Sequence, residues 1–212
     1  MCKLIIQRGK NVKMEDKRIR KTKKNLKATL IKMLSELTFS QISITELCKR
    51  ADTSRITFYS HYSDKYALVD EIFEDMLEIG TKDYYRRQKE NNPQGGLVQG
   101  YVNMLDSILA VYYDQFEFFR HTDPDKNPYL AFAFYNIVLD TVEQHTSHIQ
   151  KGNLKLKYSA RKIAGFVCFG LLGFINECHQ EKTPLEQLKK ECKNLLTDIL
   201  RSDVVVEQKA VI

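Results

Sequence analysis

Polar and apolar side chains alternate over residues 55–62 of this 212-residue chain. The apolar ones are Ile56, Phe58 and Tyr62. The polar ones have the chemistry to recognise nucleic acid, because arginine pairs with guanine O6 and N7 and the methyl of threonine packs against the methyl of thymine. A helix that reads base edges needs exposed polar or small residues near its start and apolar residues behind them. Residues 55–62 fit this division, with Arg55, Thr57, Tyr59, Ser60 and His61 as the polar set.

Two short helices joined by a tight turn are expected to position these side chains. Ser43 and Glu46 have the spacing of a capping box, in which each side chain bonds the backbone amide of the other residue, and this predicts a helix over 44–50. Asp52 tolerates the left-handed backbone of a turn, and Ser54 is the expected cap of a second helix over 55–62. An amphipathic helix over 15–37 precedes the pair, and a longer one follows Ser63. The pattern predicts a helix-turn-helix.

The charge is distributed unevenly along the chain. Residues 1–65 hold 16 Lys and Arg against 6 Asp and Glu, a net charge of +10, although the whole chain carries only +6. Six of the eight residues over 17–24 are basic, at the start of a predicted helix. The helix dipole repels cations there, and a phosphate backbone would relieve the repulsion. A nucleic-acid-binding head is expected, and a solvated basic surface is the alternative.

The segment Ile44–Leu68, I-T-E-L-C-K-R-A-D-T-S-R-I-T-F-Y-S-H-Y-S-D-K-Y-A-L, resembles the helix-turn-helix of the TetR family of bacterial transcriptional regulators. The matching positions include Ala51 and Leu68, together with several residues of the second helix. The chain departs from the family at Asp52 and Thr53, where glycine and valine are usual. The resemblance covers about residues 17–75 and is architectural beyond them.

An all-α protein of about nine helices is expected. Gly and Pro total only 13 residues, which leaves few turns for a sheet protein. Together with the resemblance, this predicts an N-terminal extension over 1–14, a three-helix DNA-binding domain over 15–63, a helical effector-binding and dimerisation domain over 64–203 and a loose tail over 204–212. The helices expected in the larger domain span about 97–119, 129–149, 156–181 and 184–201.

The resemblance also implies how the site residues act. The second helix would face the major groove of an inverted-repeat operator, with helix starts and a basic arm on the phosphates. The DNA-contacting residues implied are Ser43, Thr45, Ser54, Arg55, Thr57, Tyr59, Ser60, His61 and Lys65, with Lys21 and Lys24 on the arm.

A homodimer formed by the last two helices is a further implication. Glycines inside a helix each cost about 1 kcal/mol relative to alanine, and close approach of a partner helix would offset that cost. A crowded monomer core is the alternative explanation of these glycines. The interface residues implied are Gly165, Phe169, Gly170, Gly173, Leu188, Leu195, Leu196 and Ile199.

An apolar or aromatic small-molecule effector is expected in the same domain, and a vestigial pocket is the alternative. The candidate lining residues are Tyr101, Tyr112, Phe116, Phe132, Tyr135 and Phe169. The expected function is a repressor that leaves its operator when this effector binds. The alternative is a TetR-like scaffold that acts as a co-regulator through protein–protein contacts.

Other classes of protein are disfavoured by the sequence. It contains no glycine-rich phosphate loop and no nucleophile elbow, so an enzyme is not expected. The five cysteines include no C-x-x-C pair, and His145 and His148 lack a matching third ligand, so neither a metal nor another cofactor is expected. Buried structural thiols are favoured over a redox sensor. The chain has neither a spanning apolar run nor a secretion signal, which predicts a cytoplasmic protein without a membrane partner.

Overall fold

The computed structural model describes residues 17–150 and 157–202. Within these ranges the chain forms nine α-helices and no strand, which confirms the all-α prediction. The chain divides into two compact units, Met1–Ile72 and Phe73–Ile212. The division falls inside a helix, and the domain boundary expected after residue 63 stays a prediction. The predicted N-terminal extension and C-terminal tail lie outside the described residues.

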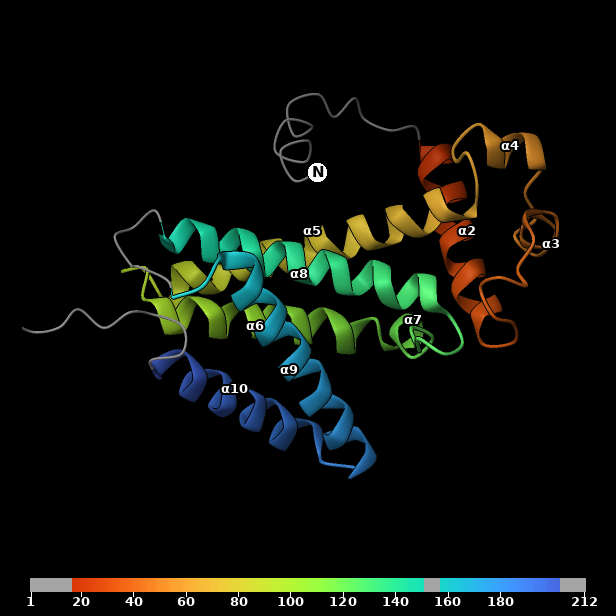
Figure 1. Ribbon diagram of the computed structural model, residues 1–212. Helices are drawn as coiled ribbons and strands as arrows, with labels where there is room; N and C mark the ends of the chain where they lie inside the picture. The colour runs from red at the N-terminus through yellow and green to blue at the C-terminus, as the bar shows by residue number, and fades with distance from the viewer. Residues whose placement is uncertain (1–16, 151–156, 203–212) are drawn as a thin grey trace, which may run out of the picture. The chain divides into compact units, whose positions relative to one another are not determined.

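The first unit contains α2 (Lys17–Leu34), α3 (Ile44–Arg50), α4 (Arg55–Tyr59) and the start of α5 (Lys65–Asn91) (Figure 1). Both α2 and α4 end three residues earlier than the sequence pattern predicts. The amide of His61 bonds the carbonyl of Phe58, so the chain after α4 tightens into a turn. Completely buried apolar side chains from all four helices form the core of this unit; they include Leu26, Leu30, Met33, Leu47, Phe58, Leu68 and Val69.

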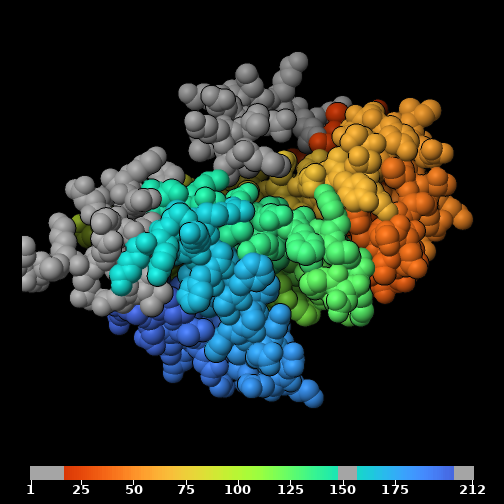
Figure 2. Space-filling model, in the orientation of Figure 1, coloured from red at the N-terminus to blue at the C-terminus, as the bar shows by residue number. Residues whose placement is uncertain are grey.

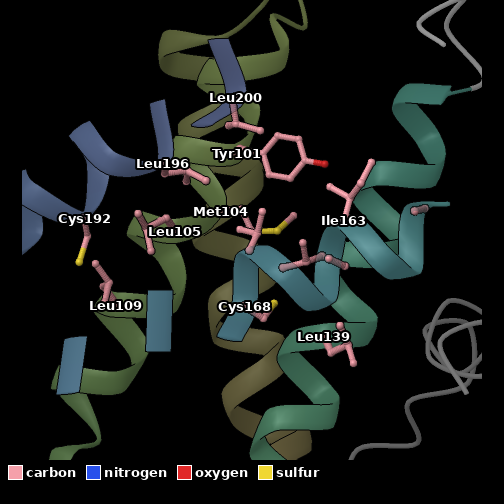
Figure 3. Close-up of a cluster of buried hydrophobic side chains, with 14 of the residues drawn as sticks. Tyr101, Met104, Leu105, Leu109, Leu139, Ile163, Cys168, Cys192, Leu196 and Leu200 are labelled. Carbon is pink, nitrogen blue, oxygen red and sulfur yellow. The ribbon is translucent and has the colours of Figure 1, made fainter. Parts of the chain in front are cut away.

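The second unit contains the rest of α5 and five further helices. These are α6 (Leu97–Asp114), α7 (Phe116–Phe119), α8 (Pro128–Gln150), α9 (Ala160–Gln180) and α10 (Leu185–Arg201). The predicted helix over 97–119 is therefore broken at Gln115. Side chains from α6, α8, α9 and α10 meet in one apolar core, in which Figure 3 shows Tyr101, Leu105, Leu139, Ile163 and Leu196. In the described part of the chain, no helix is both long and apolar enough to cross a lipid bilayer.

A network of hydrogen bonds and ion pairs joins three helices of the second unit. Asp83 on α5 accepts hydrogen bonds from Arg87 Nε at 2.6 Å and from Ser107 Oγ of α6 at 2.9 Å. Asp106 of α6 in turn pairs with Lys193 Nζ of α10 at 2.7 Å. Burial alone would raise the pKa of Asp83, but the hydrogen bonds from Arg87, Arg86 and Ser107 lower that pKa to about 2. The ionised carboxylate therefore stabilises the folded state.

We expect Asp83→Asn to lower the free energy of unfolding by about 2 kcal/mol at neutral pH. The pKa of Asp83 is depressed from 3.8 to about 2, so its contribution is complete above the unfolded value and is lost as the pH falls between the two. Urea unfolding at a series of pH values measures how the free energy of unfolding changes with pH. The variant should lack the part of this slope that Asp83 causes. Asp140→Asn, at an exposed carboxylate, is the control, and an equal loss of slope there would contradict the assignment.

Candidate nucleic-acid interface

The first helix of the predicted helix-turn-helix, α3, is capped by its preceding serine. Ser43 Oγ accepts a hydrogen bond from the amide of Glu46 at 3.1 Å, as the capping box predicts. The return bond predicted from Glu46 is not the one formed, because its carboxylate accepts from Arg50 Nε at 2.8 Å. Arg50 also donates to Glu36 at 2.6 Å, which links α3 to the chain after α2. Ser43 thus has a structural role, and its phosphate contact stays a prediction.

The turn between α3 and α4 has the left-handed backbone expected at Asp52, where φ is 46°. The amide of Thr53 closes the turn by donating to the carbonyl of Cys48 at 2.9 Å. Asn25 of α2 donates from its side-chain amide to the carbonyl of Ala51 at 2.6 Å. These bonds tie the turn to α2 and α3, which fixes the point from which α4 starts.

The second helix, α4, turns one face inward and the other outward. Ser54 caps it by accepting from the amide of Thr57 at 3.0 Å, and the hydroxyls of these two residues bond each other at 2.8 Å. Phe58 is completely buried, whereas Arg55, Tyr59 and Ser60 are exposed. Figure 2 shows the orange atoms of this part of the chain at the surface. The structure thus exposes Arg55, Tyr59 and Ser60, whereas Thr57 and His61 are half-buried, and the base contacts of all five stay a prediction.

Ile56 belongs to this outward face, although the sequence pattern groups it with the apolar residues behind the helix. Its side chain is 85% exposed. The correction has a simple geometric reason: Phe58 marks the inward face, and Ile56, about 200° away around the helix, must point outward. The helical period of 3.6 residues was the signal that could have identified it.

Lys65 lies at the start of α5, and its ammonium is directed into the protein. It donates to the carbonyls of Phe39 at 2.7 Å, Ile42 at 2.8 Å and Ser40 at 3.1 Å. Burial lowers the pKa of this ammonium group below its usual value. All three donors of the ammonium are occupied, so Lys65 holds the loop before α3 and has no N–H to spare for a phosphate as long as these bonds persist.

The remaining predicted DNA contacts lie at the surface of the first unit. Thr45, Lys21 and Lys24 are exposed, and His61 is half-buried. Two lysines near Lys21 and Lys24 form ion pairs within the protein. Lys27 pairs with Glu71 at 2.9 Å, and Lys23, which belongs to the basic run, pairs with Glu71 at 3.4 Å. Only part of the basic run predicted over 17–24 therefore presents its charge outward.

The predicted interface residues of the second unit separate into two groups. Leu188 and Leu196 are 1% exposed and pack in the core of their own chain, so they are wrongly assigned to a partner surface. Phe169 is 61% exposed on α9, and a Cβ added at Gly165, Gly170 or Gly173 would meet nothing within 4 Å. The glycines are thus not required by a crowded core within one chain. Leu195 and Ile199 of α10 are half-buried.

The predicted effector residues do not gather at one place. Tyr112 stacks on Phe119 with ring centroids 5.0 Å apart and has Phe116 beside it at 6.2 Å. Tyr101 is buried elsewhere, where its hydroxyl bonds Thr146 Oγ1 at 2.5 Å.

A third location holds Tyr135, which contacts Phe169 with ring centroids 4.4 Å apart. Phe169 and Phe132 are both more than half exposed, and their contact with an effector stays a prediction. The six residues therefore do not define a single pocket.

The thiols described are buried and free, as in the structural interpretation of the sequence. Burial raises the pKa of Cys168 to about 12 and that of Cys192 to about 11, which leaves few reactive thiolates at neutral pH. Among the residues placed by the structure, no group of three His, Cys, Asp or Glu side chains is arranged to hold a metal ion. The side chain of His148 lies outside the described residues.

No protein-family model matches the sequence, and no curated protein matches it. Solved structures do match its fold. A TetR transcriptional regulator from Streptococcus agalactiae 2603V superposes with a TM-score of 0.54 at 20% identity, over 88% of this chain and 99% of that chain. The dihydroxyacetone kinase operon activator DhaS gives a TM-score of 0.45 at 21% identity, over 84% of this chain and 94% of that chain. The chain thus shares the fold of a TetR transcriptional regulator.

We expect Lys65→Met to lower the free energy of unfolding by about 2 kcal/mol, because three carbonyls lose a charged donor. Urea unfolding followed by circular dichroism measures the change. Lys24→Met, at an exposed lysine of the same unit, is the control and should have little effect. Unchanged stability of Lys65→Met, with only the affinity for DNA reduced, would show instead that this lysine serves the phosphate backbone.

Proposed function

We propose that this chain, which has the fold of a TetR transcriptional regulator, is a homodimeric regulator that binds an inverted-repeat DNA operator. The observation that carries the proposal is the outward face of α4. Arg55, Ile56 and Tyr59 are exposed there beside one another, while Phe58 is buried behind them. A helix that is held by one buried aromatic ring and exposes a guanidinium group is suited to enter a major groove.

The charge of the first unit supports the same function. Residues 1–65 carry a net charge of +10, and the exposed Lys21 and Lys24 contribute to it. Contacts between lysine or arginine and phosphates release counterions, so the affinity for DNA should fall steeply as the salt concentration rises. Two copies of α4 in a dimer would meet major grooves about one helical turn apart, which is why we propose an inverted repeat.

The exposed face of α9 supports the dimer. Phe166, Phe169 and Leu172 are all more than two-fifths exposed on a helix that also carries open glycine positions. An apolar patch of this kind is typical of an interface. Lys162 precedes the patch and Glu177 follows it, so antiparallel pairing of two α9 helices would bring opposite charges together.

Repression released by an effector is the finer form of this proposal. An effector releases the operator only if it binds one dimer geometry more tightly than the geometry that fits DNA. The second unit, with its aromatic cluster around Tyr112 and Phe119, is where we place such control. The co-regulator alternative places the main contacts on a partner protein instead.

We expect Arg55→Ala to reduce affinity for a specific operator by about 1–3 kcal/mol, since the pair with guanine is lost, and Tyr59→Ala to reduce it as well. Fluorescence anisotropy with the DNA that flanks the gene of this protein, against scrambled DNA of equal length, measures the effect at two salt concentrations. Both variants should keep the helicity and the oligomeric state of the unmodified chain.

Arg201→Ala, at an exposed arginine of the second unit, is the matched control and should bind like the unmodified protein. Equal and weak binding of the unmodified chain to both DNAs would contradict an operator at this locus. If DNA selected from a random library also binds no more tightly than scrambled DNA, the co-regulator alternative is favoured.

We expect Gly170→Ala to have opposite effects on folding and on association. Within one chain the added methyl meets nothing, so alanine should stabilise the helix by up to about 1 kcal/mol. In a dimer with closely packed α9 helices, the same methyl should separate the two helices and weaken association. Sedimentation equilibrium gives the dimer affinity, and urea unfolding of dilute protein gives the stability. A more stable chain with unchanged association would remove Gly170 from the interface.

A further inference from the structure

Ile56 is the most exposed of the large apolar side chains that the structure describes, at 85%. Isoleucine is among the residues most often buried in folded proteins, and here its exposed side chain and the exposed ring of Tyr59 together form an apolar patch. The packing of the first unit offers Ile56 no buried position, because Phe58 already fills the core behind α4. The side chain is therefore available to a partner that approaches the outward face.

Ile56 shares an open surface with Arg55, Tyr59 and Ser60. Ile56 and Tyr59 are three residues apart and so are neighbours on one side of the helix. The guanidinium carbon of Arg55 lies 6.0 Å from the centroid of the Tyr59 ring, within the range of a cation–π contact. The hydroxyl of Ser60 is turned away, since it donates to the carbonyl of Thr57 at 2.7 Å. This surface thus combines apolar side chains with one guanidinium group.

An apolar surface in the major groove has one complementary group on the standard bases. Thymine alone presents a methyl group there, at C5, and the other three bases present polar atoms or an unsubstituted edge. Thr57, whose own methyl makes it the other candidate partner of this group, is half-buried, and its hydroxyl bonds Ser54. Ile56 is better placed than Thr57, because its side chain is exposed.

We infer that Ile56, with the ring of Tyr59 beside it, reads the C5-methyl group of a thymine in each half of the operator. The inference rests on the proposed function, in which α4 enters the major groove. 5-Methylcytosine carries a methyl group at the same position, and we assign the contact to thymine. Ile56 is thereby a specificity-determining residue, and Arg55 selects a neighbouring base.

Methyl-deleted DNA tests this assignment directly. The full chain first selects a preferred duplex from a random library, and each thymine of that duplex is then replaced by uracil, which lacks only the methyl. The affinities of the unmodified chain, Ile56→Ala and Thr57→Ser are measured by anisotropy. Thr57→Ser is the matched control, because it loses a methyl group but keeps the hydroxyl that bonds Ser54.

Uracil at one position of each half-site should lower the affinity of the unmodified chain and of Thr57→Ser for the duplex. The expected loss is about fourfold for each half-site, the usual effect of one buried methyl. Ile56→Ala should bind the thymine and uracil duplexes equally. At that position, 5-methylcytosine should bind the unmodified chain less well than thymine does, since its base pair differs in the groove.

Three results would overturn the inference. Indifference of the unmodified chain to uracil at every position would show that no thymine methyl is read. An equal uracil penalty in Ile56→Ala would assign the methyl to another side chain, and loss of that penalty in Thr57→Ser would assign it to Thr57. Failure of the proposed function has a different signature, because the selection would then recover no preferred duplex at all.

Discussion

The burial of Phe58 is the constraint on which the candidate interface depends. A helix of five residues does not form alone in water, since nucleation costs more than so few hydrogen bonds return. Phe58 supplies the missing free energy by filling the core of the first unit, and Ser54 satisfies an amide at the start of the helix. Once this ring points inward, helical geometry directs Ile56 outward, about 200° away, and Arg55 and Tyr59 are exposed on either flank of the helix.

Polar contacts on both sides of α3 and α4 complete the placement. The left-handed Asp52 permits the turn, and Asn25 bonds the carbonyl of Ala51 just before it. Lys65 bonds the carbonyls of the loop that leads into α3. Each of these groups satisfies backbone atoms that would otherwise be costly to remove from water. A basic residue beside the proposed DNA-binding helix can thus serve the fold first, and its charge alone does not identify a phosphate contact.

The second unit distributes its apolar residues differently. Its core uses one side of α9 and α10, including Leu188 and Leu196, and leaves Phe169 and the glycines of α9 on the outside. Exposed apolar area is unfavourable in water, and burying it against a second copy would remove this cost. The proposed dimer and the proposed operator symmetry therefore follow from the same surface.

The sequence by itself determined what local chemistry controls: the all-α class, the caps at Ser43 and Ser54, the turn at Asp52 and the chain segment of the outward-facing residues. These features depend on residues a few positions apart, and such spacing is visible in one dimension. The tertiary structure decided which way a side chain points when both directions are compatible with the pattern. It turned Leu188 inward and the ammonium of Lys65 toward three carbonyls, and it separated Tyr101 from Tyr112. These outcomes depend on contacts between residues far apart in the chain, so local spacing carries no record of them.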